Sequence, residues 1–188
     1  MKIVVVAHHS RLGRAKRLPA DHIVIDDADR GALWGHTRAL EWCAVQGGRC
    51  VVMEDDALPV PDFRARAAQW LAHCPNDLVS LYLGTGRPPQ YQAEIKRQLA
   101  SGNYVVRLPQ LIHGVCYSVP AWGVCDVLRA IHKGPADFAI GKAWRSVTGR
   151  DVVYPAESLV DHDDLPSVEK HPDGRPRIER RRAWKLAT

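Results

Sequence analysis

The stretch Cys50-Val51-Val52-Met53-Glu54-Asp55-Asp56-Ala57-Leu58-Pro59 decides the fold that we predict from this sequence. A short apolar run bounded by polar residues is typical of a fully buried β-strand. This run leads directly into three consecutive carboxylates, which repel one another strongly unless water or a cation neutralises them. Carboxylate oxygens suit Mg²⁺ or Mn²⁺, which keep open positions for water and substrate phosphates. Because an open α/β sheet binds ligands at the carboxyl ends of its strands, we expect a cation site here. The alternative is a solvated acidic turn before Pro59.

Length, composition and charge limit the class of protein. The chain has 188 residues, 46% of them hydrophobic and 25% charged, which fits one globular domain. No apolar run is long enough for a membrane span, and the first residues read as a strand, so we expect a cytoplasmic protein. The five cysteines include no CxxC pair, which indicates reduced thiols. The net charge of +5 favours a phosphate-bearing partner, either a nucleotide or a nucleic acid.

Apolar runs alternate with amphipathic segments along roughly the first hundred residues, which predicts an α/β sheet with helices on both faces. We expect helices between the strands and a strand pair formed by 104–108 and 111–119 across Pro109. The other strands that we expect are 2–7, 22–25, 50–53, 78–83 and 152–155.

Two loops at expected strand ends are candidate ligand-binding segments. His8 and Arg11 begin a basic loop that could hold the base or phosphates of a nucleotide; the alternative is a solvated turn. Adjacent histidines on an extended chain point to opposite sides, so at most one of His8 and His9 should bind metal. Gly84 and Thr85 open a loop that lacks the Lys-Ser/Thr of a P-loop, and we expect it to shape an acceptor pocket.

Several short motifs together carry a resemblance to a known family. They are Val-Val-Met-Glu-Asp-Asp-Ala at 51–57, Leu-Tyr-Leu-Gly at 81–84, the His-x-x-Tyr strand at 113–120, Pro-Ala-Asp-Phe at 135–138, and a closing segment at 154–160. The sequence resembles the GT-A nucleotide-sugar glycosyltransferases, most closely glycosyltransferase family 25. The resemblance implies a single α/β domain over 1–170 with a GT-A-like (Rossmann-like) mixed sheet. Its nucleotide-sugar-binding half would be 1–100 and its acceptor half 101–170, followed by a basic tail over 171–188.

The resemblance also implies roles for individual residues. Asp56 would coordinate Mn²⁺ or Mg²⁺, with Glu54 or Asp55 helping directly or through the donor sugar. His162 would be the C-terminal metal ligand, although family 25 members often have another polar residue there. Asp137 would be the general base, against the alternative of a helix-start acid whose pKa the helix dipole holds down. His113 would line the acceptor pocket. Apart from the resemblance, cations such as Arg11, Arg14 or Lys170 could stabilise the diphosphate electrostatically as its bond to the sugar breaks.

These expectations define a metal-dependent glycosyltransferase that moves a hexose from a nucleotide sugar, with a UDP-sugar favoured, to an acceptor hydroxyl. The basic tail, with Trp184 available for stacking, suits a DNA acceptor such as a flipped-out hydroxymethylated base in phage DNA, which would place the protein in the host cytoplasm. A glycan or lipooligosaccharide acceptor is the alternative. Two other classes of protein are alternatives. One is a metal-dependent phosphohydrolase that uses Asp55, Asp56, His8 and His162, and the other is a non-catalytic nucleic-acid-binding module.

Overall fold

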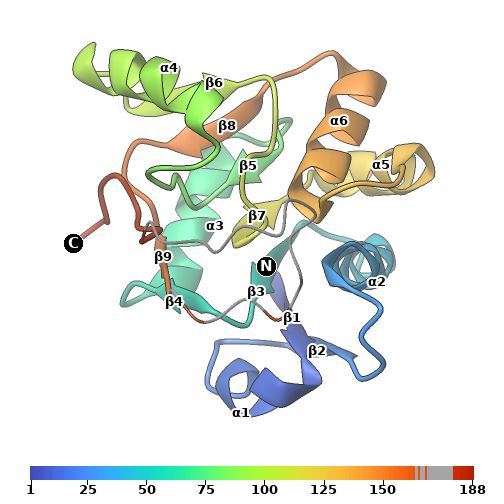
Figure 1. Cartoon of the computed structure of the whole chain (residues 1–188). Coiled ribbons are helices and arrows are strands. Elements are labelled where there is room, and N and C mark those ends of the chain that lie inside the picture. The colour runs from blue at the N-terminus through green and yellow to red at the C-terminus, as the bar shows by residue number, and fades with distance from the viewer. Residues whose placement is uncertain (164, 166–167, 169–179) are drawn as a thin grey trace.

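A computed structural model describes residues 1–163, 165, 168 and 180–188 of this chain. Its main sheet contains β1 (Lys2–His8), β2 (His22–Asp26), β3 (Cys50–Glu54), β5 (Val79–Ser80), β6 (Val105–Leu108), β7 (Cys116–Ser118) and β8 (Val152–Pro155). The strand order is β2-β1-β3-β7-β5-β8-β6 (Figure 1). β1 runs parallel to β2 and β3, and β5 runs parallel to β8, whereas the other pairs are antiparallel. The structure therefore confirms a single-domain α/β fold with a mixed, Rossmann-like sheet.

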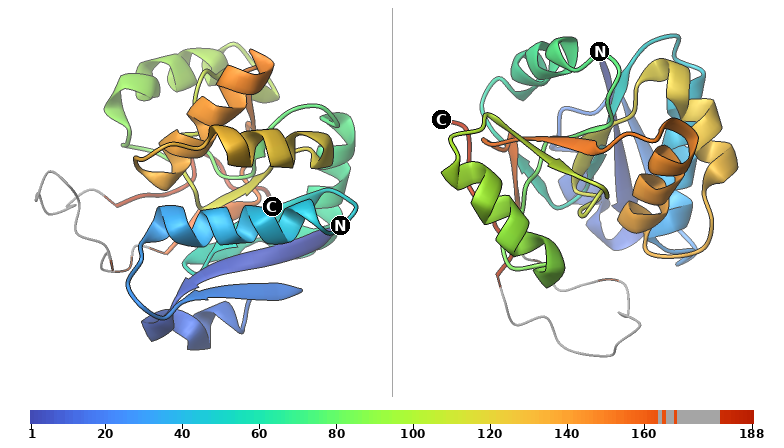
Figure 2. Two further views of the ribbon diagram at one scale, coloured as in Figure 1. Left: turned by 90° about the vertical axis from the view of Figure 1, so that its right-hand side faces the viewer. Right: turned by 90° about the horizontal axis from the view of Figure 1, so that it is seen from above.

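Helices cover both faces of this sheet, as expected (Figure 2). Alternate residues of β1 face opposite sides, so Val4 and Val6 join one core cluster while Ile3 and Val5 join the other. The first cluster packs under α2 (Ala32–Ala44), α4 (Pro89–Ala100), α5 (Val124–Ala130) and α6 (Ala136–Thr148), and the second under α1 (Leu12–Ala15) and α3 (Phe63–His73).

The strand that precedes the acidic triplet lies inside the sheet, between β1 and β7. Its residues from Cys50 to Met53 are buried, because both faces of the strand are covered. In the parallel registers, Val6 pairs with Glu54 and His8 pairs with Asp26. The carboxyl ends of β1, β2 and β3 therefore meet at one edge of the sheet, and the polar residues that follow them gather there.

A separate two-stranded ribbon forms outside the strands that the sequence predicted. β4 (Ala57–Pro59) pairs antiparallel with β9 (Val160–His162), with Ala57 opposite His162. The N–H of Asp163 extends this pairing by donating to the Asp56 carbonyl at 2.9 Å. Each strand has only three residues, which is too short for a periodic sequence pattern to predict it.

The expected pairing of 104–108 with 111–119 is wrong. β6 pairs with β8, and β7 lies between β3 and β5. The connecting chain is no hairpin turn, since its residues from Gln110 to Val115 are buried. The N–H of Ile112 donates to Tyr154 Oη at 2.9 Å, and that hydroxyl donates to the Gln110 carbonyl at 2.7 Å. These hydrogen bonds to Tyr154 fix the buried segment that connects β6 to β7.

The last nine residues lie against the domain. Ala183 forms a bridge with Gly84, and Leu186 forms one with Ser158. Trp184 packs on one core cluster and Ala187 is buried in the other. Of the expected basic tail, residues 171–179 lie outside the described part of the chain, while 180–188 are integrated with the preceding residues. In the described residues, no helix combines the length and apolar character that crossing a membrane requires.

Candidate functional site

A cavity of about 1240 Å³ opens at the carboxyl ends of β1 and β3. Most of the residues that the sequence singled out line it, although they come from distant parts of the chain: His8, Arg11, Glu54, Asp55, Asp56, His113, Asp137 and His162. Lys170 lies outside the described residues. The structure therefore brings the expected metal, donor and base residues into one cavity.

Glu54, Asp56 and His162 form the centre of this cavity. Each offers a ligand atom within 4.8 Å of those of the other two. His162 Nε2 lies 3.6 Å from Asp56 Oδ2, a separation that follows from the β4–β9 register. Asp56 and His162 are buried, whereas the Glu54 side chain remains 27% exposed toward the cavity. The arrangement is a carboxylate-rich cluster with one imidazole.

His36 holds the Glu54 side chain in place through a hydrogen bond. It is fully buried on α2, with Nε2 3.0 Å from Glu54 Oε1 and Nδ1 3.1 Å from Tyr117 Oη. Burial alone would raise the Glu54 pKa. The hydrogen bond and charge of His36, together with the charges of His162 and Arg181, outweigh burial and lower this pKa. No local sequence pattern around His36 shows that it meets the end of β3.

Asp56 lies in an environment that disfavours its negative charge. Burial, followed by the charges of Glu54 and Asp55, raises the pKa of Asp56 to about 7. Its Oδ1 atom is buried and has no hydrogen-bond partner among the described residues. Its Oδ2 atom accepts from Arg11 Nη1 at 3.2 Å. A buried, unbonded carboxylate oxygen beside a second carboxylate fits a divalent cation, and oxygen-rich donors favour Mg²⁺ or Mn²⁺.

Asp55 makes different contacts from those of Asp56. Its Oδ2 atom accepts the backbone N–H of His8 at 2.9 Å, and its Oδ1 atom accepts from Arg11 Nη1 at 3.2 Å. Burial raises its pKa. Asp55 therefore ties the end of β1 to the end of β3 and holds Arg11 against the cluster.

Asp137 lies in the first turn of α6 and lines the cavity. Asp137 is therefore the helix-start acid of the alternative interpretation, but its pKa is raised and not lowered. Burial, followed by the negative charge of Glu54, raises the pKa to about 6, although the N–H of Phe138 donates to Asp137 Oδ1 at 2.8 Å. Loss of water contact against the cavity wall outweighs the favourable backbone dipoles.

His113 lines the cavity as expected, but Gly84 and Thr85 do not. Gly84 packs behind His113, and a Cβ atom there would lie 2.7 Å from His113 Nε2. Thr85 donates to the Arg182 carbonyl through its N–H at 2.8 Å and its hydroxyl at 3.1 Å. Their assignment to an acceptor pocket is corrected, because the C-terminal segment engages this part of the loop. The same loop contributes Arg87, Pro88 and Pro89 to the cavity lining.

Burial lowers the pKa of His113 to about 3, with the charges of Arg181 and His162 acting in the same direction. Its ring also packs on the edge of Tyr82, with ring centroids 5.0 Å apart. His113 is therefore neutral at physiological pH and forms a fixed part of the cavity wall.

Arg181 is a cavity residue that sequence reasoning assigned to the tail. It lines the cavity; its positive charge contributes to the lowered pKa of Glu54 and partly offsets the rise in the pKa of Asp56. The neighbouring backbone holds it in place, since Thr85 N–H binds the Arg182 carbonyl and Trp184 N–H donates to the Leu83 carbonyl at 2.9 Å. No local signal separates Arg181 from the adjacent arginines; only the packing of the segment does.

No protein-family model matches this sequence. No curated protein shows significant sequence similarity to it. Among solved structures, the chain is similar to the "Crystal Structure of A197 from STIV", with a TM-score of 0.55 and 11% sequence identity. The match covers 96% of this chain and 99% of that chain. At this identity, the likeness shows the fold alone.

Proposed function

We propose that this protein is a metal-dependent transferase that moves a sugar from a nucleotide-sugar donor, with a UDP-sugar favoured, to an acceptor hydroxyl. One observation carries the proposal. A single cavity combines the Glu54–Asp56–His162 cluster, the cations Arg11 and Arg181, and a carboxylate of raised pKa, Asp137.

The cluster and the cations fit the phosphate end of such a donor. Glu54, Asp56 and His162 would hold Mn²⁺ or Mg²⁺, which when bound neutralises charge on the diphosphate. Arg11 lies 3.2 Å from both Asp55 and Asp56, at the border between the acids and the open cavity. Arg11 and Arg181 would bind phosphate oxygens and stabilise the negative charge that grows on the departing diphosphate.

Asp137 fits the role of general base. The acceptor oxygen would attack the anomeric carbon while the bond from that carbon to the donor phosphate breaks. The bonding electrons leave with the diphosphate, and the hydroxyl proton passes to Asp137. A carboxylate with a pKa of about 6 is ionised at neutral pH and is a stronger base than an exposed aspartate. One base with direct attack favours inversion at the anomeric carbon.

For the acceptor, we propose DNA carrying a hydroxymethylated base. The net charge of +5 supports a polyanionic partner, and Arg180 and Arg182 are exposed on either side of the cavity residue Arg181. Such a target base would be flipped out of the duplex to reach Asp137. Action on intracellular DNA would place the enzyme in the cytoplasm, or in the host cytoplasm if a phage encodes it.

Thermal unfolding against a panel of nucleotide sugars tests the proposal, because a ligand that binds the native state raises its apparent stability. We expect one donor to raise the melting temperature in Mn²⁺, and the shift to vanish with chelator and in Asp56→Asn. That donor is then incubated with hydroxymethylated DNA and with glycans, and the products are analysed by mass spectrometry. Stabilisation by plain DNA without metal, and by no donor, would overturn the proposal in favour of a binding module.

A further inference from the structure

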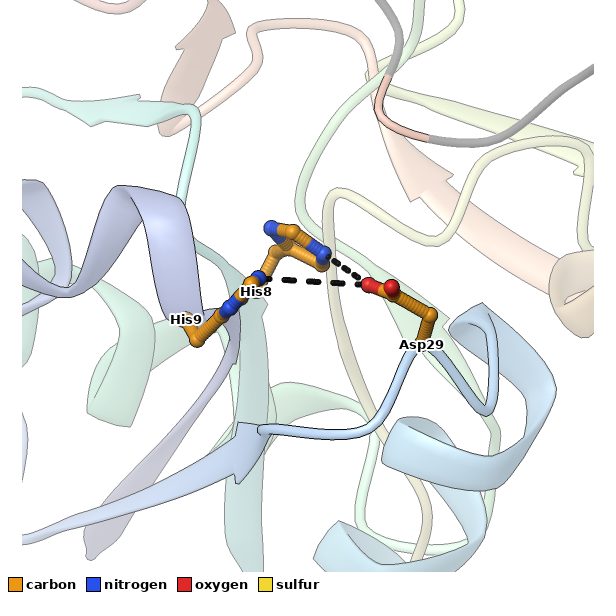
Figure 3. Close-up of side chains that lie close together, drawn as sticks. All are labelled: His8, His9 and Asp29. Carbon is orange, nitrogen blue, oxygen red and sulfur yellow. Dashed lines mark hydrogen bonds and ion pairs between the residues drawn. The ribbon is translucent and has the colours of Figure 1, made fainter.

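His8, His9 and Asp29 form a second group of potential metal ligands, separate from the Glu54–Asp56–His162 cluster (Figure 3). His8 Nε2 lies 2.7 Å from Asp29 Oδ1, and His9 Nε2 lies 3.9 Å from the same oxygen. All three residues line the cavity. No step of the proposed transfer uses this group.

The expectation that at most one of the two adjacent histidines binds metal rests on a premise that the local backbone does not meet. It assumed an extended chain, in which neighbouring side chains point to opposite faces. β1 ends at His8, and the 3-10 turn η1 (His9–Arg11) begins at the next residue. The turn brings both rings to one side, with centroids 4.1 Å apart and planes at 77°.

The surroundings of these residues brace the backbone of the loop that carries Asp29. Asp29 has a φ of 51°, a left-handed conformation that aspartate tolerates better than most residues. The buried Asp26 carboxylate fixes that loop by accepting from Ala28 N–H at 3.2 Å and from Gly31 N–H at 2.7 Å. The Asp29 carboxylate is therefore presented to the two rings by a braced loop.

Ser10 gives His8 the support that a metal-bound imidazole needs. His8 Nδ1 lies 2.7 Å from Ser10 Oγ. A serine hydroxyl can donate to this nitrogen or accept from it. Without metal, His8 Nδ1 also accepts from the Ser10 backbone N–H at 3.3 Å, which leaves the ring proton on Nε2, facing Asp29. Metal binding at Nε2 would move the proton to Nδ1, and Ser10 Oγ would then accept it.

We propose that His8, His9 and Asp29 bind a late first-row transition metal ion such as Zn²⁺ or Co²⁺ at the edge of the cavity. Imidazole-rich sites favour these ions over Mg²⁺. With metal–ligand bonds of about 2.1 Å, tetrahedral ligand atoms lie about 3.4 Å apart. The two separations from Asp29 Oδ1, 2.7 and 3.9 Å, bracket this value, and the two histidine nitrogens lie within 4.8 Å of each other, so side-chain rotations would complete the geometry. The remaining position would take water or an anionic oxygen of a cavity ligand.

The test is a Zn²⁺ titration of the full chain labelled with ¹⁵N-histidine, followed by the ring nitrogen resonances, and a parallel Co²⁺ titration followed by visible absorption. We expect Zn²⁺ to shift the Nε2 resonances of His8 and His9. Asp29→Asn and His9→Gln should each weaken binding by at least about 10-fold. Asn tolerates the left-handed backbone at position 29, and His132→Gln, an exposed histidine outside the cavity lining, is the matched control.

Asp56→Asn separates this site from the proposed transferase chemistry. We expect the Zn²⁺ shifts of His8 and His9 to persist in Asp56→Asn, whatever happens to donor binding. Equal Zn²⁺ affinity for the wild type, Asp29→Asn and His9→Gln would overturn the proposal. Zn²⁺ shifts confined to His162 would overturn it as well, and neither result would bear on the donor measurements.

Discussion

His162 reaches Asp56 across the β4–β9 pair, which places its Nε2 atom 3.6 Å from Asp56 Oδ2. The two residues are distant in sequence and meet only when the ribbon forms. The cluster is therefore a property of the folded chain, and a cation that binds it should stabilise the native state by mass action.

Gly114→Ala should disrupt the cluster without replacing a ligand. A Cβ atom at Gly114 would lie 2.7 Å from Glu54 Oε1 and 3.2 Å from His36 Nε2. Either Glu54 or His36 must move, so we expect Mn²⁺ affinity to fall by about 10-fold or more. Gly48→Ala is the control, because its Cβ meets nothing within 4 Å. Equal Mn²⁺ affinities of the two variants, measured by calorimetry, would remove Glu54 from the ligand set.

The titration of Asp137 should make the stability of the protein depend on pH. The pKa of Asp137 in the folded protein, about 6, lies above its ordinary value of 3.8, so the protonated form is favoured by folding. The associated stability is complete below the ordinary value and is lost as the pH rises through 6. We therefore expect Asp137→Asn to melt at a higher temperature than the wild type at pH 8, and the difference to shrink toward pH 4.5.

Transferase activity should show the opposite dependence, because only ionised Asp137 accepts a proton. The rate should fall below a pH of about 6, and Asp137→Asn should lose about 10²–10⁴-fold in kcat. Stabilisation without loss of activity would leave Asp137 as a buried acid with no role in proton transfer.

Arg181→Gln should weaken donor binding. Hydrogen bonds to charged groups contribute about 1.5–3 kcal/mol, so the loss should be about 10-fold to 100-fold in Kd. Arg182→Gln is the matched control, because Arg182 is exposed and its carbonyl, which Thr85 binds, is unchanged by the substitution. Parallel titrations with the same nucleotide sugar check the difference. An equal loss in both variants would indicate general electrostatic attraction.

Arg49 should stabilise the fold and take no part in the proposed sugar transfer. Its guanidinium donates to Ser118 Oγ at 2.9 Å, to the Cys74 carbonyl at 2.5 Å and to the Asp77 carbonyl at 2.5 Å. Arg49→Met leaves these acceptors unsatisfied and should cost about 2–4 kcal/mol of unfolding free energy.

Arg49→Lys should recover little of this loss, since an ammonium group cannot reproduce the planar fork. Urea denaturation measures both variants against Arg38→Met, which removes only an exposed pair with Glu41. A destabilisation of Arg49→Met no greater than that of Arg38→Met would contradict this role.

Sequence patterns predicted the parts of the fold that local forces decide. The apolar run at 50–53 had to be buried, and the three acids that follow it had to lie at its carboxyl end. The alternation of strands and helices fixed the α/β class. His162 and Asp137 were named through a family resemblance, and both line the cavity that Asp56 also lines.

The predictions from sequence failed where contacts between residues distant in the chain determine the structure. The ribbon of β4 and β9 is too short to leave a periodic pattern, and the crossing between β6 and β7 depends on bonds to Tyr154. Arg181 enters the cavity because Ala183 and Leu186 pair with distant residues. His8 and His9 share a side because a strand ends between them. No pattern within a short window contains this information.

The most direct test of the central claim is a Mn²⁺ titration followed by the electron paramagnetic resonance signal of the free ion. We expect the wild type to remove a single equivalent of Mn²⁺ from solution at low concentration. Asp56→Asn and His162→Gln should not, whereas His132→Gln should behave as the wild type. Undiminished Mn²⁺ binding by Asp56→Asn and His162→Gln, or none by the wild type, would contradict the assignment of Glu54, Asp56 and His162 as the metal-binding centre.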